Sequence, residues 1–125
     1  MRTLAQQAGD AAEAIVAKQL AAARWQILGR NVRVGRAELD IVAVDPAGPA
    51  LVIVEVRWRS RRDFGLAEET VDHRKRAHLR RAVFGLLEHG VLPDGTTIPR
   101  LPFRIDLVVV EPGARIRHHR SFEAG

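Results

Sequence analysis

The chain has 125 residues, a length that one domain usually occupies, and we expect residues 1–125 to form a single domain. Its formal charge of +5 and its pI of about 11.1, carried almost wholly by arginine, favour a phosphate-bearing partner such as DNA over a membrane surface. The absence of cysteine excludes disulfides, thiolate metal sites and a cysteine nucleophile. No apolar stretch approaches the roughly 20 residues that span a bilayer, so we expect a cytoplasmic protein.

The first half of the chain predicts one helix and three strands. Apolar residues recur with a period of 3.6 from Leu4 to Ala23, which is typical of an amphipathic helix. Segments rich in Val, Ile and Leu, bounded by Gly and Pro, then predict strands at Trp25–Val34, Ala37–Val44 and Leu51–Val56.

The second half predicts a long helix and one further strand. The helix runs from about Leu66 to Glu88 and ends before Gly90. The apolar run Phe103–Val110 suits a central strand, and Ile116–Phe122 forms either a short edge strand or a frayed tail. The order predicts an α/β fold whose mixed sheet is flanked by helices. The second helix is a right-handed crossover that makes the Phe103 strand parallel to the third strand.

A hairpin brings four charged residues together. The turn at residues 45–49 joins the second and third strands, and in the register that it sets Asp40 lies opposite Glu55. Glu38 lies opposite Arg57 in the same ladder, on the same face.

Opposed carboxylates destabilise a sheet unless a positive charge neutralises them. Mg²⁺ or Mn²⁺ would do so, since such ions bind one or two carboxylates together with water and substrate phosphate. Alternatively Arg57 and a neighbouring arginine neutralise the acids, and no metal is bound. The spacing leaves both alternatives open.

Basic residues cluster after the third strand and at the start of the second helix. The residues expected to contact nucleic acid are Arg33, Arg59, Arg61, Arg62, Arg74 and Arg76. Trp25 and Trp58 are expected in the core, with base stacking as the alternative for Trp58.

The remaining polar residues predict no second site. The five histidines lack metal-ligand spacing and are expected at the surface. Asp106 alternates with apolar neighbours and is expected to pair with Arg104 or another arginine.

Several motifs together resemble the YraN-type family of uncharacterised bacterial proteins. They are Gly9 with Glu13, Asn31-Val-Arg33, the run Ala-Glu-Leu-Asp-Ile-Val at 37–42, Val-Glu-Val-Arg at 54–57, and Phe-Arg-Ile-Asp at 103–106. The resemblance implies a fold similar to restriction endonucleases and Holliday-junction resolvases.

In that nuclease superfamily an Asp, a Glu and a following Lys form the metal-dependent centre. The resemblance therefore implies that Asp40 and Glu55 are metal ligands and that Glu13 supports them. The superfamily lysine is Arg57 here, which stays protonated and can stabilise phosphate charge without accepting a proton. Lys75, expected on the apolar stripe of the second helix, either replaces that lysine or extends its ammonium group to solvent.

Three functions remain open at this stage. The first is a Mg²⁺- or Mn²⁺-dependent endonuclease that acts on DNA, and the second is a nucleic-acid-binding module that has lost catalysis through Arg57. The third is a protein-interaction domain whose arginines bind an acidic partner. Analogy with resolvase-like folds adds a homodimer as a further expectation.

Overall fold

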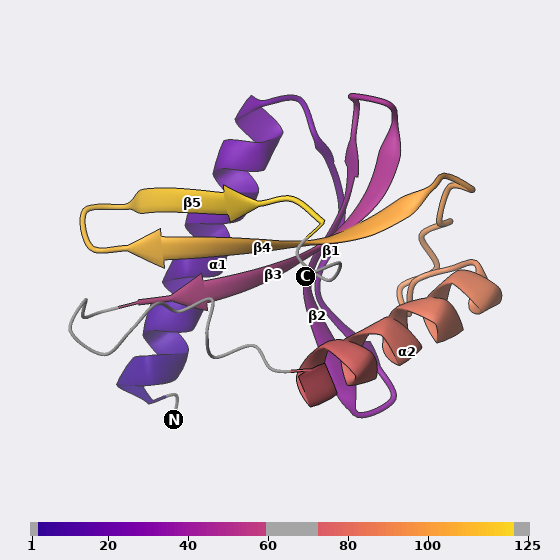
Figure 1. The fold of residues 1–125 in the computed structure, drawn as a ribbon, viewed down its shortest axis with the longest axis horizontal. Coiled ribbons are helices and arrows are strands. Elements are labelled where there is room, and N and C mark those ends of the chain that lie inside the picture. The colour runs from indigo at the N-terminus through magenta and orange to yellow at the C-terminus, as the bar shows by residue number, and fades with distance from the viewer. Residues whose placement is uncertain (1–2, 60–72, 122–125) are drawn as a thin grey trace.

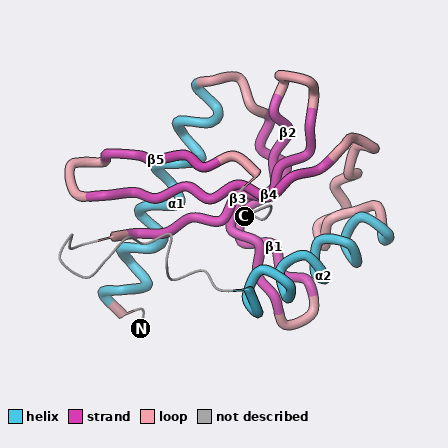
Figure 2. Tube along the Cα trace, in the orientation of Figure 1, coloured by secondary structure: helices cyan, strands magenta, loops and turns pink. Residues whose placement is uncertain are grey.

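The computed structural model describes residues 3–59 and 73–121, without the side chains of residues 5 and 73–76. Within these described residues, two helices and five strands follow one another in the predicted order (Figures 1 and 2). They are α1 (Leu4–Ala22), β1 (Gln26–Val34), β2 (Ala37–Asp45), β3 (Ala50–Trp58), α2 (His73–His89), β4 (Phe103–Glu111) and β5 (Arg115–His119). The part of α2 predicted before residue 73 lies outside the described residues.

The five strands form one mixed sheet in the order β1-β2-β3-β4-β5. The first three are antiparallel neighbours, β4 runs parallel to β3, and β5 is antiparallel to β4. The parallel pairing confirms that α2 lies in a crossover connection. The segment after β4 is an edge strand, as one of the two alternatives for residues 116–122 predicted.

Each helix covers one face of the sheet, because successive side chains of β3 point to opposite faces. Val52 and Val54 pack with Val16 of α1 in one apolar cluster, while Ile53 packs with Val83 of α2 in the other. Figure 1 shows α1 behind β3, β4 and β5, and α2 across the β1–β2 side of the molecule. None of the described helices is long and apolar enough to cross a membrane.

The two tryptophans differ from each other in burial. Trp25 is buried against α1, as expected. Trp58 is 40% exposed, so its prediction as a core residue is wrong. The reason is its place at the end of β3, where β2 no longer pairs with the strand; the β2–β3 ladder ends at Ile41 and Val54.

Candidate metal and nucleic-acid site

The candidate site lies where β2 and β3 separate. Their ladder runs from Asp45 opposite Ala50 to Ile41 opposite Val54, which is the predicted register. It stops one residue short of Asp40 opposite Glu55, so neither this pair nor the predicted pair of Glu38 with Arg57 forms part of the ladder. β3 continues beside β4 as far as Trp58 opposite Val110.

Asp40 is the first residue of β2 beyond the end of the β2–β3 ladder. Its Oδ2 accepts a hydrogen bond from the backbone N–H of Val56 at 2.8 Å. The pKa of Asp40 is raised to about 7, first because burial disfavours the charged form and then because Glu55 adds a nearby negative charge. The Val56 hydrogen bond and the positive charge of Arg57 lower this pKa only in part. A cation beside Asp40 would therefore compete with a proton near neutral pH.

Glu55 lies next to the arginine that replaces the superfamily lysine. Nη2 of Arg57 is 2.9 Å from Oε1 of Glu55, and both side chains are largely buried. Nε and Nη2 of Arg57 are nevertheless buried without a hydrogen-bond partner in the part of the chain that the structure describes. We therefore regard this pair as an ion pair without hydrogen-bond geometry. The positive charge of Arg57 therefore neutralises part of the negative charge of the carboxylates. The sequence alone left open whether a metal ion or an arginine does this.

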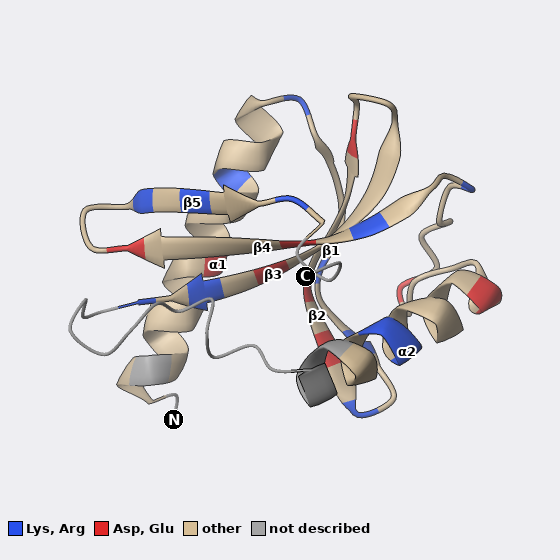
Figure 3. Ribbon diagram, viewed as in Figure 1, with Lys and Arg blue, Asp and Glu red and all other residues tan. Residues whose placement is uncertain are grey.

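Glu13 joins the same electrostatic group from α1. It is buried, and Nε of Arg30 on β1 lies 3.2 Å from its Oε1. Burial raises the pKa of Glu13 more than the hydrogen bond and charge of Arg30 lower it, and the charges of Asp10 and Glu38 raise it further. Glu13 in turn raises the pKa of Asp40. Figure 3 shows acidic residues, in red, on α1, β2 and β3.

The carboxylates fit a partial metal site. Within residues 3–59 and 73–121, no group of three or more His, Cys, Asp or Glu side chains is arranged to hold a metal ion. Mg²⁺ is often held by one or two carboxylates, with water and substrate phosphate completing its shell. Asp40 and Glu55 are two oxygen-donor residues with uncompensated negative charge at Asp40, which suits this type of ion.

The predicted basic contacts are only partly described. Arg33 is exposed on β1, with Nη2 3.6 Å from Oε2 of Glu38. Arg59 is buried, in contrast to the exposed position expected of it, and its backbone N–H bonds the Val110 carbonyl. Arg61 and Arg62 lie outside the described residues, as do the side chains of Arg74, Lys75 and Arg76.

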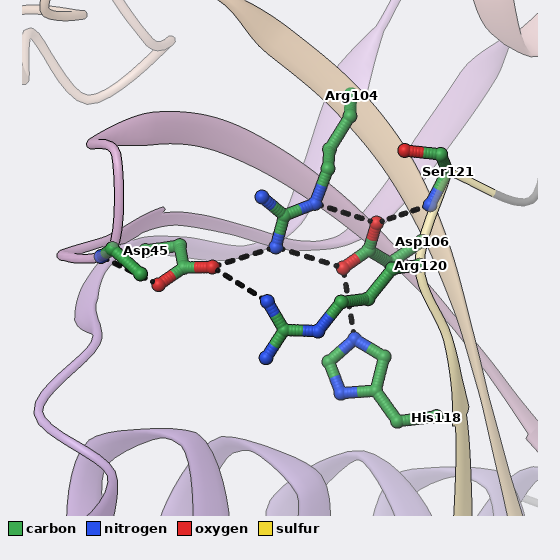
Figure 4. Close-up of polar contacts among 7 residues, drawn as sticks. Asp45, Arg104, Asp106, His118, Arg120 and Ser121 are labelled. Atoms are coloured by element: carbon green, nitrogen blue, oxygen red, sulfur yellow. Dashed lines mark hydrogen bonds and ion pairs between the residues drawn. The ribbon is translucent and has the colours of Figure 1, made fainter.

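A second polar cluster lies at the other end of β2 (Figure 4). Arg104 on β4 donates to Asp45 at 2.7 Å and to Asp106 at 3.0 Å. His118 lies 2.8 Å from Asp106, and Arg120 donates to Asp45 at 3.1 Å. The cluster joins the end of β2 to β4 and to the end of β5.

The pairing of Asp106 with Arg104 was predicted, whereas the rest of this cluster was not. His118 is half-buried rather than a surface residue, because Asp106 and the ring of Trp25 hold it. Burial opposes ionisation of Asp106, but hydrogen bonds from His118 and Arg104 hold its pKa below the usual value. A partner 59 positions away, as Arg104 is from Asp45, leaves no local signal in the sequence.

A family model described as "Uncharacterised protein family UPF0102" matches residues 12–110. The chain belongs to the UPF0102 family. A UPF0102 protein of Roseiflexus castenholzii is 38% identical over 107 residues, which are 86% of this chain and 81% of that protein. Another, of Symbiobacterium thermophilum, is 37% identical over 111 residues, 88% of this chain and 86% of its own. These matches confirm the expected YraN-type family.

Two further matches cover less of the compared protein. A UPF0102 protein of Sorangium cellulosum is 47% identical over 74 residues, so the match spans 59% of this chain and half of that relative. Among solved structures, that of Pyrococcus furiosus SfsA in complex with Ca²⁺ aligns with 92% of this chain and 63% of its own, at a TM-score of 0.30 and 15% identity. A likeness this low supports no conclusion about fold or function.

The UPF0102 match includes the acidic residues and Arg57 of the candidate site but only part of the second polar cluster. Residues 12–110 include Glu13, Asp40, Glu55 and Arg57. The matched range ends before His118, so the second cluster lies partly outside it.

Proposed function

We propose that this protein binds nucleic acid and hydrolyses phosphodiesters with Mg²⁺ or Mn²⁺ held by Asp40 and Glu55. The observation that carries the proposal is the half-buried Asp40 carboxylate beside Glu55, with its pKa raised to about 7. Strongly perturbed carboxyl groups are common at functional sites, because burial and like charges are otherwise unfavourable. The net charge of +5 supports a polyanionic substrate.

A restriction-endonuclease-like fold is part of the same proposal. The helix, the three antiparallel strands, the second helix and the parallel fourth strand follow the order that the family resemblance implies. Asp40 and Glu55, both half-buried, lie where β2 and β3 separate, and this is the place proposed for a substrate phosphate.

Each residue of the site has a distinct role in this proposal. Asp40 and Glu55 would hold the ion, which when bound supplies Lewis-acid stabilisation and an activated water. Arg57 stabilises negative charge on the phosphate but cannot accept a proton at any relevant pH. Glu13 orients a ligand water from α1, and Lys75 is the alternative source of the missing lysine.

One observation favours a second function, a nucleic-acid-binding module without catalysis. The 2.9 Å approach of Arg57 to Glu55 neutralises a carboxylate that the metal would need. In such a module Arg57 takes the place of the metal, and binding depends steeply on salt because arginines release counterions from the nucleic acid.

Calorimetric titration of Mn²⁺ into the wild type and Asp40→Asn tests the metal site without a choice of substrate. We expect the wild type to bind and Asp40→Asn to lose binding, whereas Glu88→Gln, which changes an exposed carboxylate on α2, binds as the wild type does. Equal binding by wild type and Asp40→Asn would overturn the metal assignment.

Incubation with single-stranded, duplex and branched DNA then separates the two functions. Metal-dependent cleavage that Asp40→Asn abolishes supports the endonuclease. Salt-sensitive binding with no cleavage in Mg²⁺ or Mn²⁺ supports the binding module.

A further inference from the structure

β1 departs from a regular ladder at two places, a register shift between Ile27 and Gly29 and a missing pair opposite the candidate metal ligand. β1 pairs with β2 through Arg30 opposite Ile41 and Val32 opposite Leu39. The same register places Asn31 opposite Asp40, yet this pair is missing from the ladder. Both strands flanking Asp40 therefore leave it unpaired, β3 by separating from β2 and β1 by its local conformation at Asn31.

The backbone of Asn31 explains the missing pair. Its φ of 51° lies in the left-handed region, which asparagine tolerates better than most residues but which is uncommon inside a strand. Backbone conformations of this kind persist where the surrounding structure enforces them, and they occur often at functional sites.

Two residues before Asn31, β1 packs closely against the α2–β4 loop at Gly29. A Cβ atom at Gly29 would lie 2.9 Å from Cγ2 of Val32 and 3.0 Å from Cδ1 of Leu92. The loop itself is fixed by backbone hydrogen bonds, with Leu92 donating to Thr96 at 2.8 Å and Ile98 to Gly90 at 3.0 Å. A hollow between β1 and this loop is therefore bounded by closely packed residues on one side and by a hydrogen-bonded loop on the other.

That hollow mixes basic, acidic and apolar groups, and it is connected to the candidate site by Arg30, which reaches Glu13, and by Asn31, which the register places opposite Asp40. Its volume is about 300 Å³, and its lining residues are Gly29, Arg30, Asn31, Val32, Arg33, Leu92, Pro93 and Asp94. Arg30 and Asn31 also line a neighbouring hollow of about 340 Å³, together with Asp10 and Glu38. Arg30 is 42% exposed and reaches Glu13 through Nε. Arg30 and Asn31 therefore lie between the two hollows and line both of them.

We propose that the hollow between β1 and the α2–β4 loop, called here the β1 hollow, binds one unpaired nucleotide next to the phosphate at Asp40 and Glu55. Arg30, Arg33 and the side-chain amide of Asn31 donate to its phosphate, and the exposed Pro93, which follows the buried Leu92, contacts the base. A duplex cannot place a base in this hollow without unpairing it, so the proposal names single-stranded or branched DNA as the substrate class. The inference rests on the proposed function, since it needs a nucleic acid at the Asp40 site.

Fluorescence anisotropy tests the β1 hollow with a labelled single-stranded oligonucleotide and the corresponding duplex, in EDTA and at low salt. Asn31→Gly removes the amide and permits the same φ. Its control is Gln26→Ala, an exposed amide on the same strand. Arg33→Ala is matched by Arg115→Ala, which removes an exposed arginine from β5 at the opposite edge of the sheet.

We expect Asn31→Gly and Arg33→Ala each to weaken single-strand binding by about tenfold, with a smaller effect on the duplex and none in the two controls. If the wild type binds and Asn31→Gly binds as well as Gln26→Ala does, the β1 hollow is not the nucleotide-binding site. The proposed function then still stands. An equal loss for single strand and duplex would overturn the unpaired substrate. If the wild type binds neither DNA, both the inference and the proposed function fail. Thermal unfolding of each variant shows that the fold is retained.

Discussion

The Asp40 carboxylate accepts the backbone N–H of Val56 at the point where the β2–β3 ladder stops. The side chain thereby satisfies a donor that a strand neighbour would otherwise bond. This hydrogen bond fixes one oxygen of Asp40 at the edge of β3, at the residue between Glu55 and Arg57 of the ion pair. A local break in the sheet therefore creates the candidate site.

The raised pKa of Asp40 predicts a pH-dependent cost to folding. Its folded pKa of about 7 exceeds the ordinary value of 3.8, so the folded protein keeps a proton that the unfolded chain releases. Stability therefore falls as pH rises from about 4 to about 7, by on the order of 4 kcal/mol. We expect Asp40→Asn, which keeps an oxygen for Val56, to melt above the wild type at pH 8 and equally at pH 4. The same shift at both pH values, or in Glu88→Gln, would contradict this.

Proton competition predicts how metal affinity changes with pH. Mn²⁺ must displace the proton that Asp40 holds below pH 7, since only the carboxylate binds the ion. We expect the dissociation constant to rise about tenfold for each pH unit below 7 and to level off above it. Calorimetry in two buffers of different protonation enthalpy measures the proton release directly. This pH range brackets the Asp40 pKa of about 7, so a metal affinity that does not change between about pH 5.5 and about pH 8 would show that Asp40 is not a ligand.

Arg57→Lys tests whether the arginine limits catalysis. A lysine in this buried site can exchange a proton, and general-base catalysis contributes about 10² to 10⁴ in rate. We therefore expect Arg57→Lys to raise Mn²⁺-dependent cleavage of single-stranded DNA by at least about tenfold over the wild type. Arg115→Lys, on the distant β5, should leave cleavage unchanged. Equal rates for wild type and Arg57→Lys would indicate that Arg57 suffices or that another residue supplies the proton transfer.

The sequence predicts those parts of the fold that depend on local pattern. The periodicity of α1 and the apolar run of β4 follow from burial on one or both faces. The hairpin register follows from the short turn at residues 45–49. The end of the β2–β3 ladder at Ile41 and Val54 and the left-handed conformation at Asn31 could not be predicted, because neither leaves a local pattern in the sequence. The cluster around Asp45 was missed for a related reason: its partners come from β4 and from the chain after β5.

The second polar cluster predicts acid sensitivity that is separate from the metal site. Hydrogen bonds hold the pKa of Asp106 below 3.8, so its stabilisation is fully present above about pH 4 and is lost as pH falls through the lower, folded value. Asp106→Asn weakens one of the two carboxylate contacts of Arg104 and leaves that to Asp45 in place, so we expect a loss of about 1.5 to 3 kcal/mol in unfolding free energy at pH 7. Urea denaturation measures it, with Glu88→Gln as the control. Asp106 lies opposite Val54 in the sheet, but it is not among the charges that shift the pKa of Asp40, so folded Asp106→Asn should still bind Mn²⁺ with wild-type affinity. A loss of metal affinity with the fold intact would mean that the two clusters act as one site.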